Sequence, residues 1–387
     1  MKVKIIKTNN VPIKMWCNNP EEGAIEQAIN VANLPFAFKH IAIMPDTHQG
    51  FGMPIGGVLA SKDMIVPNAV GVDIGCGVLA CKTSLTEISV DEIKKVMNLI
   101  RKNIPLGFNH RKEKQEMKSF NISLEDAPIV KQQFEKAKFQ LGTLGGGNHF
   151  IEIQKGNDGH IWFMLHSGSR NLGKTVAEYY NKLAIELNKK WSDDVPKNLE
   201  LAFLPIDTKE GQTYINEMLY CQDFAKQNRD LMAYHILQSM QEVMGNVEAL
   251  LEYNAHHNFA ALENHFGEDV WVHRKGATSA KKGEICIIPG SQGTKSYIGS
   301  GLGNPESFNS CSHGAGRTMG RKAAQRSLNL EEEIKRLDNL GIVHGIRRTK
   351  DLDEASSAYK DIEVVMEEQK DLVEILAELA PLGVVKG

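Results

Sequence analysis

Four short apolar runs in this sequence have the length of a buried strand, and each ends directly at polar residues in a glycine-rich loop. They are residues 41–44 before Asp46 and His48, residues 69–72 before Asp73, residues 161–165 before His166, and residues 285–288 before Ser291. Loops held by a rigid scaffold are where binding and catalytic residues concentrate. The pattern therefore predicts a fold containing sheets, with a site assembled at the ends of several strands.

Long helical patterns accompany these strand runs. Apolar residues at helical spacing predict three long helices, over residues 171–191, 212–244 and 355–379. Ser89 with Glu92 has the pattern of a capping box, and Asn19 followed by Pro20 is typical of a helix start. The mixture predicts a mixed α/β fold of the α+β kind, and no shift in composition marks a domain boundary.

The 34 glycines gather beside the same polar residues. Clusters lie after His48, around Asp73 and Cys76, before His149, and on both sides of His313. Glycine lets backbone N–H groups approach a ligand closely, and successive N–H groups in such turns bind anions, phosphate above all. These loops therefore predict a site that takes a ligand containing phosphate.

The charge balance excludes one class of protein. The net charge is −3, whereas a protein that coats nucleic acid through bulk charge is more basic. Any contact with nucleic acid must come from a local patch or an end-specific site, and an aromatic content of 7% argues against an extended base-stacking platform. We expect the basic residues at 273–275, 281–282 and 347–350 to be solvated surface, with phosphate contact as the alternative.

The sequence shows no signal of export or membrane insertion. The six cysteines are scattered without a CxxC pair, and there is neither a leading signal segment nor a run of about 18 apolar residues. These features predict a cytoplasmic protein with reduced thiols and no membrane contact.

Five residues of metal-ligand type lie beside the glycine-rich loops: Asp73, Cys76, His149, His166 and His257. Each alone is better explained by an ordinary role, such as a turn for the aspartate or a buried small side chain for the cysteine. Together they would furnish a site for one or two transition metals, and the softness of the thiolate would favour zinc. The segments lie far apart, so spacing does not establish that they converge.

His313 lies among small residues, with Arg317 four residues further on. A nucleophilic histidine needs open space around a ring nitrogen, and an arginine offsets charge on a phosphate under attack. The other interpretation is a glycine-rich turn in which the histidine is incidental.

Motifs spread along nearly the whole chain resemble the RtcB family of RNA ligases. They are PDTHQG at 45–50, GVDIGCG at 71–77, GGGNHFIE at 145–152, HSGSR at 166–170, HHN at 256–258, RKGA at 274–277, PGS at 289–291, CSHGAGR at 311–317 and PLGVVKG at 381–387. The resemblance implies one compact α/β domain over residues 1–387, of a fold particular to the family and not a Rossmann fold. It also implies two Mn²⁺ ions bridged by Cys76, so manganese replaces the zinc that softness favours. The other implied ligands are Asp73, His149, His166 and His257.

The resemblance further implies a reaction. His313 would take GMP from GTP as a covalent phosphoramidate and pass it to an RNA 3′-phosphate, which the 5′-hydroxyl of a second RNA end then attacks. The implied partners are GTP and RNA with a 3′-phosphate or 2′,3′-cyclic phosphate and a 5′-hydroxyl, in transfer RNA splicing or RNA repair. Whether turnover needs a helper protein stays open.

The resemblance also assigns the binding residues. The implied guanylate pocket consists of Asn148, Phe150, Glu152, Ser291, Ser296, Gly314, Ala315, Gly316, Tyr359 and Lys386. Arg170 and Arg317 are the candidates for holding RNA phosphates. One departure is Gln292, beside the base pocket, where the family usually has methionine.

Three alternatives compete with the ligase. A two-metal RNA-end phosphoesterase would have no need of His313 or a guanine pocket. A non-catalytic RNA-binding paralogue would be expected to lose some of the ligand residues, which are intact here. A structural zinc site is disfavoured by Asp73 and by the open, glycine-rich surroundings.

Overall fold

Two large β-sheets form the centre of the computed structural model, which describes residues 3–118, 120, 122–191 and 195–387. The first sheet is six-stranded, with the order β1-β2-β3-β4-β12-β11. Its strands are β1 (Lys4–Ile6), β2 (Ile13–Met15), β3 (Ala37–Phe51), β4 (Met53–Ser61), β12 (Glu268–Lys275) and β11 (Asn258–His265). Only β2 and β3 pair in parallel within it.

The second sheet is seven-stranded, with the order β10-β6-β8-β7-β17-β15-β14, and all its pairs are antiparallel. Its strands are β10 (Ala249–His256), β6 (Gly77–Thr83), β8 (Ile161–Ser167), β7 (Phe150–Gly156), β17 (Val373–Lys386), β15 (Ser296–Gly301) and β14 (Ile285–Ile288). The edge strands β10 and β14 also lie in contact, so the sheet is strongly curved. Two small pairs complete the strands: β13 (Ala277–Ser279) with β16 (Ser310–Ser312), and β5 (Met64–Ile65) with β9 (Leu204–Pro205).

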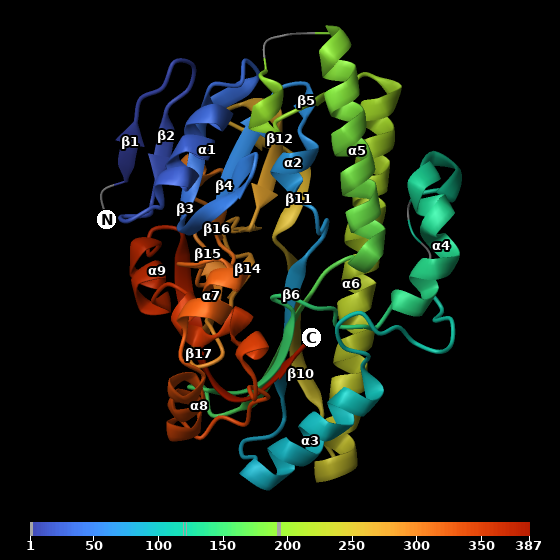
Figure 1. Cartoon of the computed structure of the whole chain (residues 1–387), viewed down its shortest axis with the longest axis vertical. Helices are drawn as coiled ribbons and strands as arrows, with labels where there is room; N and C mark the ends of the chain where they lie inside the picture. Colours follow the sequence, from blue (N-terminus) through green and yellow to red (C-terminus); the bar gives the residue numbers. More distant parts are fainter. Residues whose placement is uncertain (1–2, 119, 121, 192–194) are drawn as a thin grey trace.

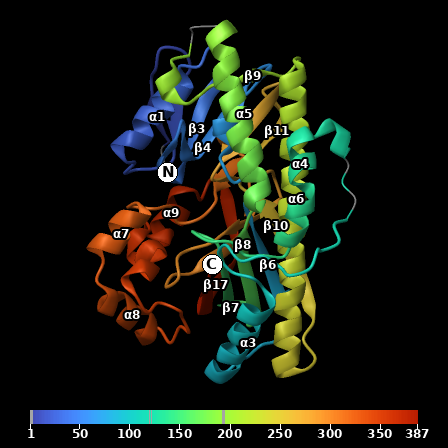
Figure 2. The same ribbon diagram turned by 45° about the vertical axis from the view of Figure 1, so that its right-hand side comes forward.

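Helices cover these sheets on the outside (Figures 1 and 2). They are α1 (Glu22–Ala32), α2 (Pro67–Val70), α3 (Val90–Asn103), α4 (Pro128–Gln140), α5 (Arg170–Trp191), α6 (Lys209–Met244), α7 (Arg321–Ser327), α8 (Leu330–Asn339) and α9 (Ile362–Glu368). Short 3₁₀ helices lie at Leu124–Asp126, Lys197–Leu199, Pro305–Ser307, Thr349–Glu354 and Ser356–Ala358. The long helix α6 packs on β6, β8 and β10 and lies beside α5. The mixed α/β prediction is confirmed, while one domain over residues 1–387 stays a prediction.

Helix α6 is long because its apolar residues recur at helical spacing. Tyr214, Met218, Cys221 and Phe224 are fully buried in one core cluster, and Met232 and Ile236 continue the stripe into a second. Burying each large side chain stabilises the fold by about 1.5–3 kcal/mol. The predicted helices over 171–191 and 212–244 are confirmed as α5 and α6, and Ser89 forms the predicted capping box with Glu92. Among the described residues no helix combines the length and apolar character that crossing a bilayer requires.

Three predictions of local structure are wrong. The helix expected over 355–379 is confined to α9, and β17 begins at Val373, because pairing with both β15 and β7 outweighs local helical spacing. Residues 69–72 are not a strand, since Pro67 starts the one-turn helix α2 and Gly71 ends it at φ 99°. Helix α1 begins at Glu22 after the N-cap Glu21, so Asn19 does not cap it.

Candidate active site

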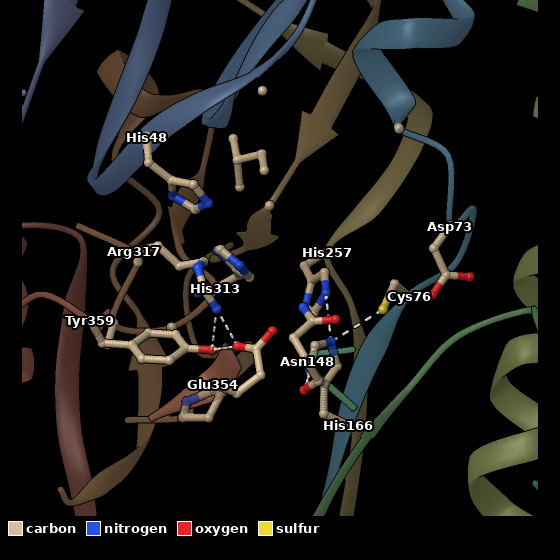
Figure 3. A pocket seen from close by; sticks show the side chains of 18 of the residues that line it. His48, Asp73, Cys76, Asn148, His166, His257, His313, Arg317, Glu354 and Tyr359 are labelled. Atoms are coloured by element: carbon tan, nitrogen blue, oxygen red, sulfur yellow. Dashed lines mark hydrogen bonds and ion pairs between the residues drawn. The ribbon is translucent and has the colours of Figure 1, made fainter. Parts of the chain in front are cut away.

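A cleft of about 1060 Å³ receives the polar ends of the strands, and Figure 3 shows its interior. One side carries Asp73, Cys76, His166 and His257. The other side is lined by Glu152, Arg317, Arg321, Glu354, Tyr359 and Lys386, and the loop 313–316 lies between them. The loops that the sequence singled out therefore converge on one cavity.

The five predicted metal ligands come together. The Cys76 sulfur lies 3.1 Å from His166 Nε2 and 3.6 Å from His149 Nε2. His149 Nε2 is 3.2 Å from Asp73 Oδ2, and His166 Nε2 is 3.2 Å from His257 Nε2. The donor atoms form two groups, Cys76 with His166 and His257, and Cys76 with Asp73 and His149, each within 4.8 Å. Cys76 belongs to both groups, so its sulfur is within reach of an ion held by either of them.

Two glycines make this convergence possible. A Cβ on Gly168 would lie 2.1 Å from Asp73 Oδ2, so any larger residue would displace the carboxylate. Gly75 has φ 73°, and a Cβ there would lie 2.8 Å from the Gln222 Cα of α6. The turn from Asp73 to Cys76 therefore rests directly on α6 and has a backbone conformation that favours glycine.

The chemistry of the donor set fits divalent transition metals. His149 Nδ1 lies 2.8 Å from the Leu144 carbonyl and His166 Nδ1 lies 3.1 Å from the Asn148 carbonyl. An N–H that donates to a carbonyl leaves Nε2 with a free lone pair facing the cluster. Burial lowers the pKa of His166 and of His257 well below the ordinary value, so both rings are neutral.

The thiol supports the same conclusion. Burial, with the Asp73 carboxylate beside it, raises the pKa of Cys76 well above its ordinary value. The thiolate therefore requires positive charge next to it, which a bound cation supplies. The donor types alone do not separate manganese from zinc.

His313 is held by a carboxylate that sequence reasoning did not assign to the site. Its Nδ1 lies 2.6 Å from Asp46 Oδ2, which also accepts from the backbone N–H groups of His313 (3.0 Å) and Gly314 (3.3 Å). Burial opposes ionisation of Asp46, but the pKa of this carboxyl stays below its ordinary value because of His313. The Nδ1–H bond to Asp46 leaves Nε2 as the free nitrogen, and the ring lies 4.8 Å from that of His257. The signal was present in the sequence, since Asp46 ends one of the apolar runs.

The opposite side of the cleft holds Glu152 and Lys386 of the predicted guanylate residues, whereas Asn148 lies beside His166 and Ser296 is buried behind the cleft lining. Glu152 is buried on β7 and accepts a 2.8 Å hydrogen bond from Gln154, which also reaches the Ser296 hydroxyl at 3.1 Å. Burial raises the pKa of Glu152 to about 8. Lys386, at the end of β17, pairs in register with Phe150 and donates to the Gly147 carbonyl at 3.1 Å. Glu152 and Lys386 therefore lie on neighbouring strands of one sheet.

Glu354 joins the remaining charged residues there, and sequence reasoning missed it. This buried carboxylate accepts from Arg317 and the Tyr359 hydroxyl (Figure 3). It also accepts from Arg321 Nε at 2.6 Å. The Arg317 guanidinium lies 5.1 Å from the Tyr359 ring centre and donates to the Asp353 and Met319 carbonyls. Its donors are thus engaged by protein groups. No pattern around residue 354 signals this role, because it follows from tertiary pairing.

The role of Arg170 at an RNA phosphate stays a prediction, and the basic residues 281–282, 347–348 and 350 are exposed as expected. Arg170 lies beside the metal-ligand group and donates to Thr143 Oγ1 (3.2 Å) and the Gly107 carbonyl (3.3 Å). The expectation of a solvated 273–275 segment is wrong, since His273, Arg274 and Lys275 are buried. The strand β12 lies between β4 and β11, so both its edges are paired, and this end of it is packed inside the fold, where Arg274 pairs with the buried Glu263 of β11. Lys275 lines the cleft, donates to the Phe51 (2.5 Å) and Asn68 (2.9 Å) carbonyls, and burial lowers its pKa to about 7.

The fold thus places a buried set of Cys, His and Asp donors that could hold metal ions in a cleft of about 1060 Å³. A model of the family described as tRNA-splicing ligase RtcB matches residues 27–127 and 114–387. The RNA-splicing ligase RtcB1 of Escherichia coli strain ATCC 25922 is 39% identical over 412 residues, and the RNA-splicing ligase RtcB of strain K12 is 38% identical over 415; both alignments cover 100% of each chain. The tRNA-splicing ligase RtcB of Nanoarchaeum equitans is 33% identical, covering 98% of this chain and 96% of its own.

The chain therefore belongs to the RtcB family of RNA ligases, as the motifs predicted.

Proposed function

We propose that this protein joins an RNA 3′-phosphate or 2′,3′-cyclic phosphate end to a 5′-hydroxyl end, using GTP and two Mn²⁺ ions. The observation that carries the proposal is the His313 ring, fixed by Asp46 through Nδ1 and lying between a metal-ligand cluster and a pocket with a buried carboxylate. The printed names of the relatives, RNA-splicing and tRNA-splicing ligase, support RNA splicing as the setting. RNA repair and a cytoplasmic location are part of the proposal and rest on the sequence alone.

In the first step, His313 Nε2 attacks the α-phosphorus of GTP. An N–P bond forms, the bond from this phosphorus to the bridging oxygen breaks, and pyrophosphate leaves. The ring becomes positively charged during attack, and Asp46 stabilises that charge at Nδ1–H. Asp46 thus has the orienting and charge-balancing role that a carboxylate has behind a catalytic histidine.

In the second step, an oxygen of the RNA 3′-phosphate attacks the same phosphorus and His313 leaves. The 5′-hydroxyl then attacks the RNA phosphorus, a phosphodiester forms, and GMP departs. Asp73, Cys76, His149, His166 and His257 would hold the two Mn²⁺ ions, which supply Lewis-acid stabilisation of phosphate charge and activation of the water that opens a cyclic phosphate.

Guanine selection falls to Glu152. An ionised carboxylate accepts two hydrogen bonds from the N1–H and N2–H₂ edge of guanine, an edge that adenine lacks. Tyr359 would pack on the base and Lys386 would donate to its carbonyl. The remaining pocket residues are Asn148, Phe150, Ser291, Ser296, Gly314, Ala315 and Gly316, and Arg170 and Arg317 would contact RNA phosphates. Arg317 would have to exchange a partner to do so, since Glu354 holds it.

The test is to incubate the protein with α-labelled GTP and Mn²⁺, and then to denature it. We expect a covalent guanylate that is labile in acid, as a phosphoramidate is, and that is absent from His313→Ala. The matched control is His110→Ala, which removes an exposed histidine and should label normally. No adduct on the wild type with any divalent metal would refute nucleotidyl transfer and favour the two-metal phosphoesterase.

A further inference from the structure

One buried arginine of α6 contacts three of the loops that carry metal-ligand side chains. Arg229 has no exposed surface. Its Nη1 donates to the Gly75 carbonyl at 3.0 Å and to the Ser167 carbonyl at 2.8 Å. Its Nε donates to Asn254 Oδ1 at 2.6 Å, and its Nη2 lies 3.1 Å from His256 Nδ1.

These partners are sequence neighbours of the ligands themselves. Gly75 precedes Cys76, Ser167 follows His166, and His256 precedes His257. One guanidinium therefore contacts the backbone or side chain next to three of the five donors, from the side of the cluster that faces α6.

The preceding residue, Asn228, extends the same contact to a fourth loop. Its Oδ1 accepts from the backbone N–H groups of Gly142 (2.7 Å) and Thr143 (3.0 Å), at the start of the loop that leads to His149. Its Nδ2 donates to Ser167 Oγ at 3.1 Å and to the Gly168 carbonyl at 3.2 Å. Two consecutive side chains of one helix thus organise the loops that carry Cys76, His149, His166 and His257.

We propose that Arg229 is a positioning residue for the metal site, which fixes the spacing of the Cys76, His166 and His257 loops and adds positive charge behind the anionic donors Asp73 and Cys76. The inference rests on the metal site of the proposed function and extends it to a residue with no ligand atom of its own. Outer contacts that orient ligands in this way contribute strongly to metal affinity.

The geometry requires an arginine in particular. A planar guanidinium presents five donors in fixed directions and can hold acceptors on several sides, whereas a lysine ammonium on a flexible stem cannot hold the same set. An apolar side chain would leave the Gly75 and Ser167 carbonyls without this donor in a buried place, which is costly. Core packing fixes the position of α6 at this point, because Phe224 and Met232 on either side of Arg229 are fully buried in two core clusters.

The competing explanation is that Arg229 only stabilises the fold. The two explanations separate when metal affinity and stability without metal are measured on the same variants. Arg229→Lys keeps the positive charge but loses the planar set of guanidinium donors, and Arg229→Met loses both the charge and the donors. Lys226→Met is the matched control: this lysine lies one turn earlier on α6, is largely exposed, and pairs with Asp230 at 3.0 Å.

The experiment titrates each full-length variant with Mn²⁺ alone, without nucleotide or RNA, and measures free Mn²⁺ by electron paramagnetic resonance. We expect the dissociation constant to rise about 10- to 100-fold in Arg229→Met. It should rise by a smaller factor in Arg229→Lys and stay within about twofold of wild type in Lys226→Met. Thermal unfolding of the metal-free proteins, followed by circular dichroism, reports stability separately.

Wild-type affinity in both Arg229 variants would overturn the inference while leaving the proposed ligase intact. If Arg229→Met does not fold, Arg229→Lys decides alone, and an unchanged dissociation constant there would equally overturn it. If the wild type binds no Mn²⁺, the metal assignment of the proposed function fails and this inference with it. Guanylylation by Arg229→Lys that recovers at saturating Mn²⁺ would support positioning over damage to the nucleotide pocket.

Discussion

The two sides of the cleft satisfy their polar groups in opposite ways. On the metal side, Nδ1 of His149 and Nδ1 of His166 each lie at hydrogen-bond distance from a backbone carbonyl. Their Nε2 atoms therefore face the Cys76 sulfur. On the nucleotide side, ion pairs hold the charged groups, and the single Glu354 carboxylate is paired to both Arg317 and Arg321. The metal side thus presents converging lone pairs that suit a cation, whereas the nucleotide side has two guanidinium groups to one ionised carboxylate, which suits a ligand with phosphate. Changes on the metal side should therefore abolish the reaction, while changes on the nucleotide side should alter affinity and selectivity.

The largest effect is expected from Cys76→Ser, since the thiolate is common to both donor groups. Because outer contacts alone cost about 10- to 100-fold in metal affinity, losing a shared ligand should reduce Mn²⁺ binding by at least about 100-fold. Guanylylation should fall accordingly. Calorimetric titration with Mn²⁺ measures this, and Cys81→Ser, a buried cysteine of β6 outside the cluster, serves as control. Normal binding by Cys76→Ser would contradict the shared-thiolate arrangement.

Asp46→Asn comes next, and it tests whether the carboxylate behind His313 acts through its charge. The amide keeps the size of the side chain but cannot stabilise a positively charged ring. We expect the single-turnover rate of guanylylation to fall by about 100-fold or more, with little change in Mn²⁺ affinity. A rate within threefold of wild type would show that His313 does not depend on this ion pair.

Glu152→Gln should change selectivity more than rate. Burial raises the pKa of Glu152 to about 8, so in the empty pocket the carboxyl is largely protonated at neutral pH and ionises as pH rises. Guanine needs the ionised acceptor, so the preference for GTP over ATP should strengthen between about pH 6.5 and 8.5 in the wild type. Lys386 and Gln154 are the charged and polar groups facing this carboxyl.

In Glu152→Gln that preference should drop about tenfold and lose its pH dependence, because charged hydrogen bonds contribute about 1.5–3 kcal/mol. Competition binding of the two nucleotides at a series of pH values measures the ratio and cancels titration of the triphosphate. A wild-type ratio independent of pH would place the base elsewhere.

The smallest effect is expected from Ser296→Ala. The hydroxyl accepts from the Gly290 N–H at 3.1 Å and from Gln154 at 3.1 Å. The substitution therefore removes two hydrogen bonds between uncharged groups, and it affects GTP binding only through Gly290 and Gln154. About 1 kcal/mol corresponds to a roughly fivefold rise in KM for GTP, with kcat unchanged. Steady-state kinetics checks this. A large fall in kcat would show that the nucleotide side takes part in the chemical step and does not act on GTP affinity alone.

The sequence predicted the fold class and the convergence of the site loops better than it predicted the local structure around them. Asp73, Cys76, His149, His166 and His257 could be recognised because glycine-rich motifs mark them, and the structure brings all five together. Glu354 and Arg229 could not be recognised, since their roles arise from pairing across the fold.

Local patterns failed where tertiary pairing decided the outcome. Residues 373–379 have helical spacing, yet they complete the sheet as part of β17. Residues 273–275 look like a solvated basic segment, yet β12 is a covered inner strand.

The position of β17 in its sheet has a consequence for how the protein is made. The strands β10, β6, β8 and β7 form one block, β15 and β14 form another, and β17 is the strand that joins them. During synthesis both blocks leave the ribosome before β17 does, so β7 and β15 each present an unpaired edge for a time. Lys386 lies at the far end of that joining strand. Until β17 pairs with both β7 and β15, the sheet stays in two blocks and Lys386 is absent from the cleft, so the nucleotide side is completed last.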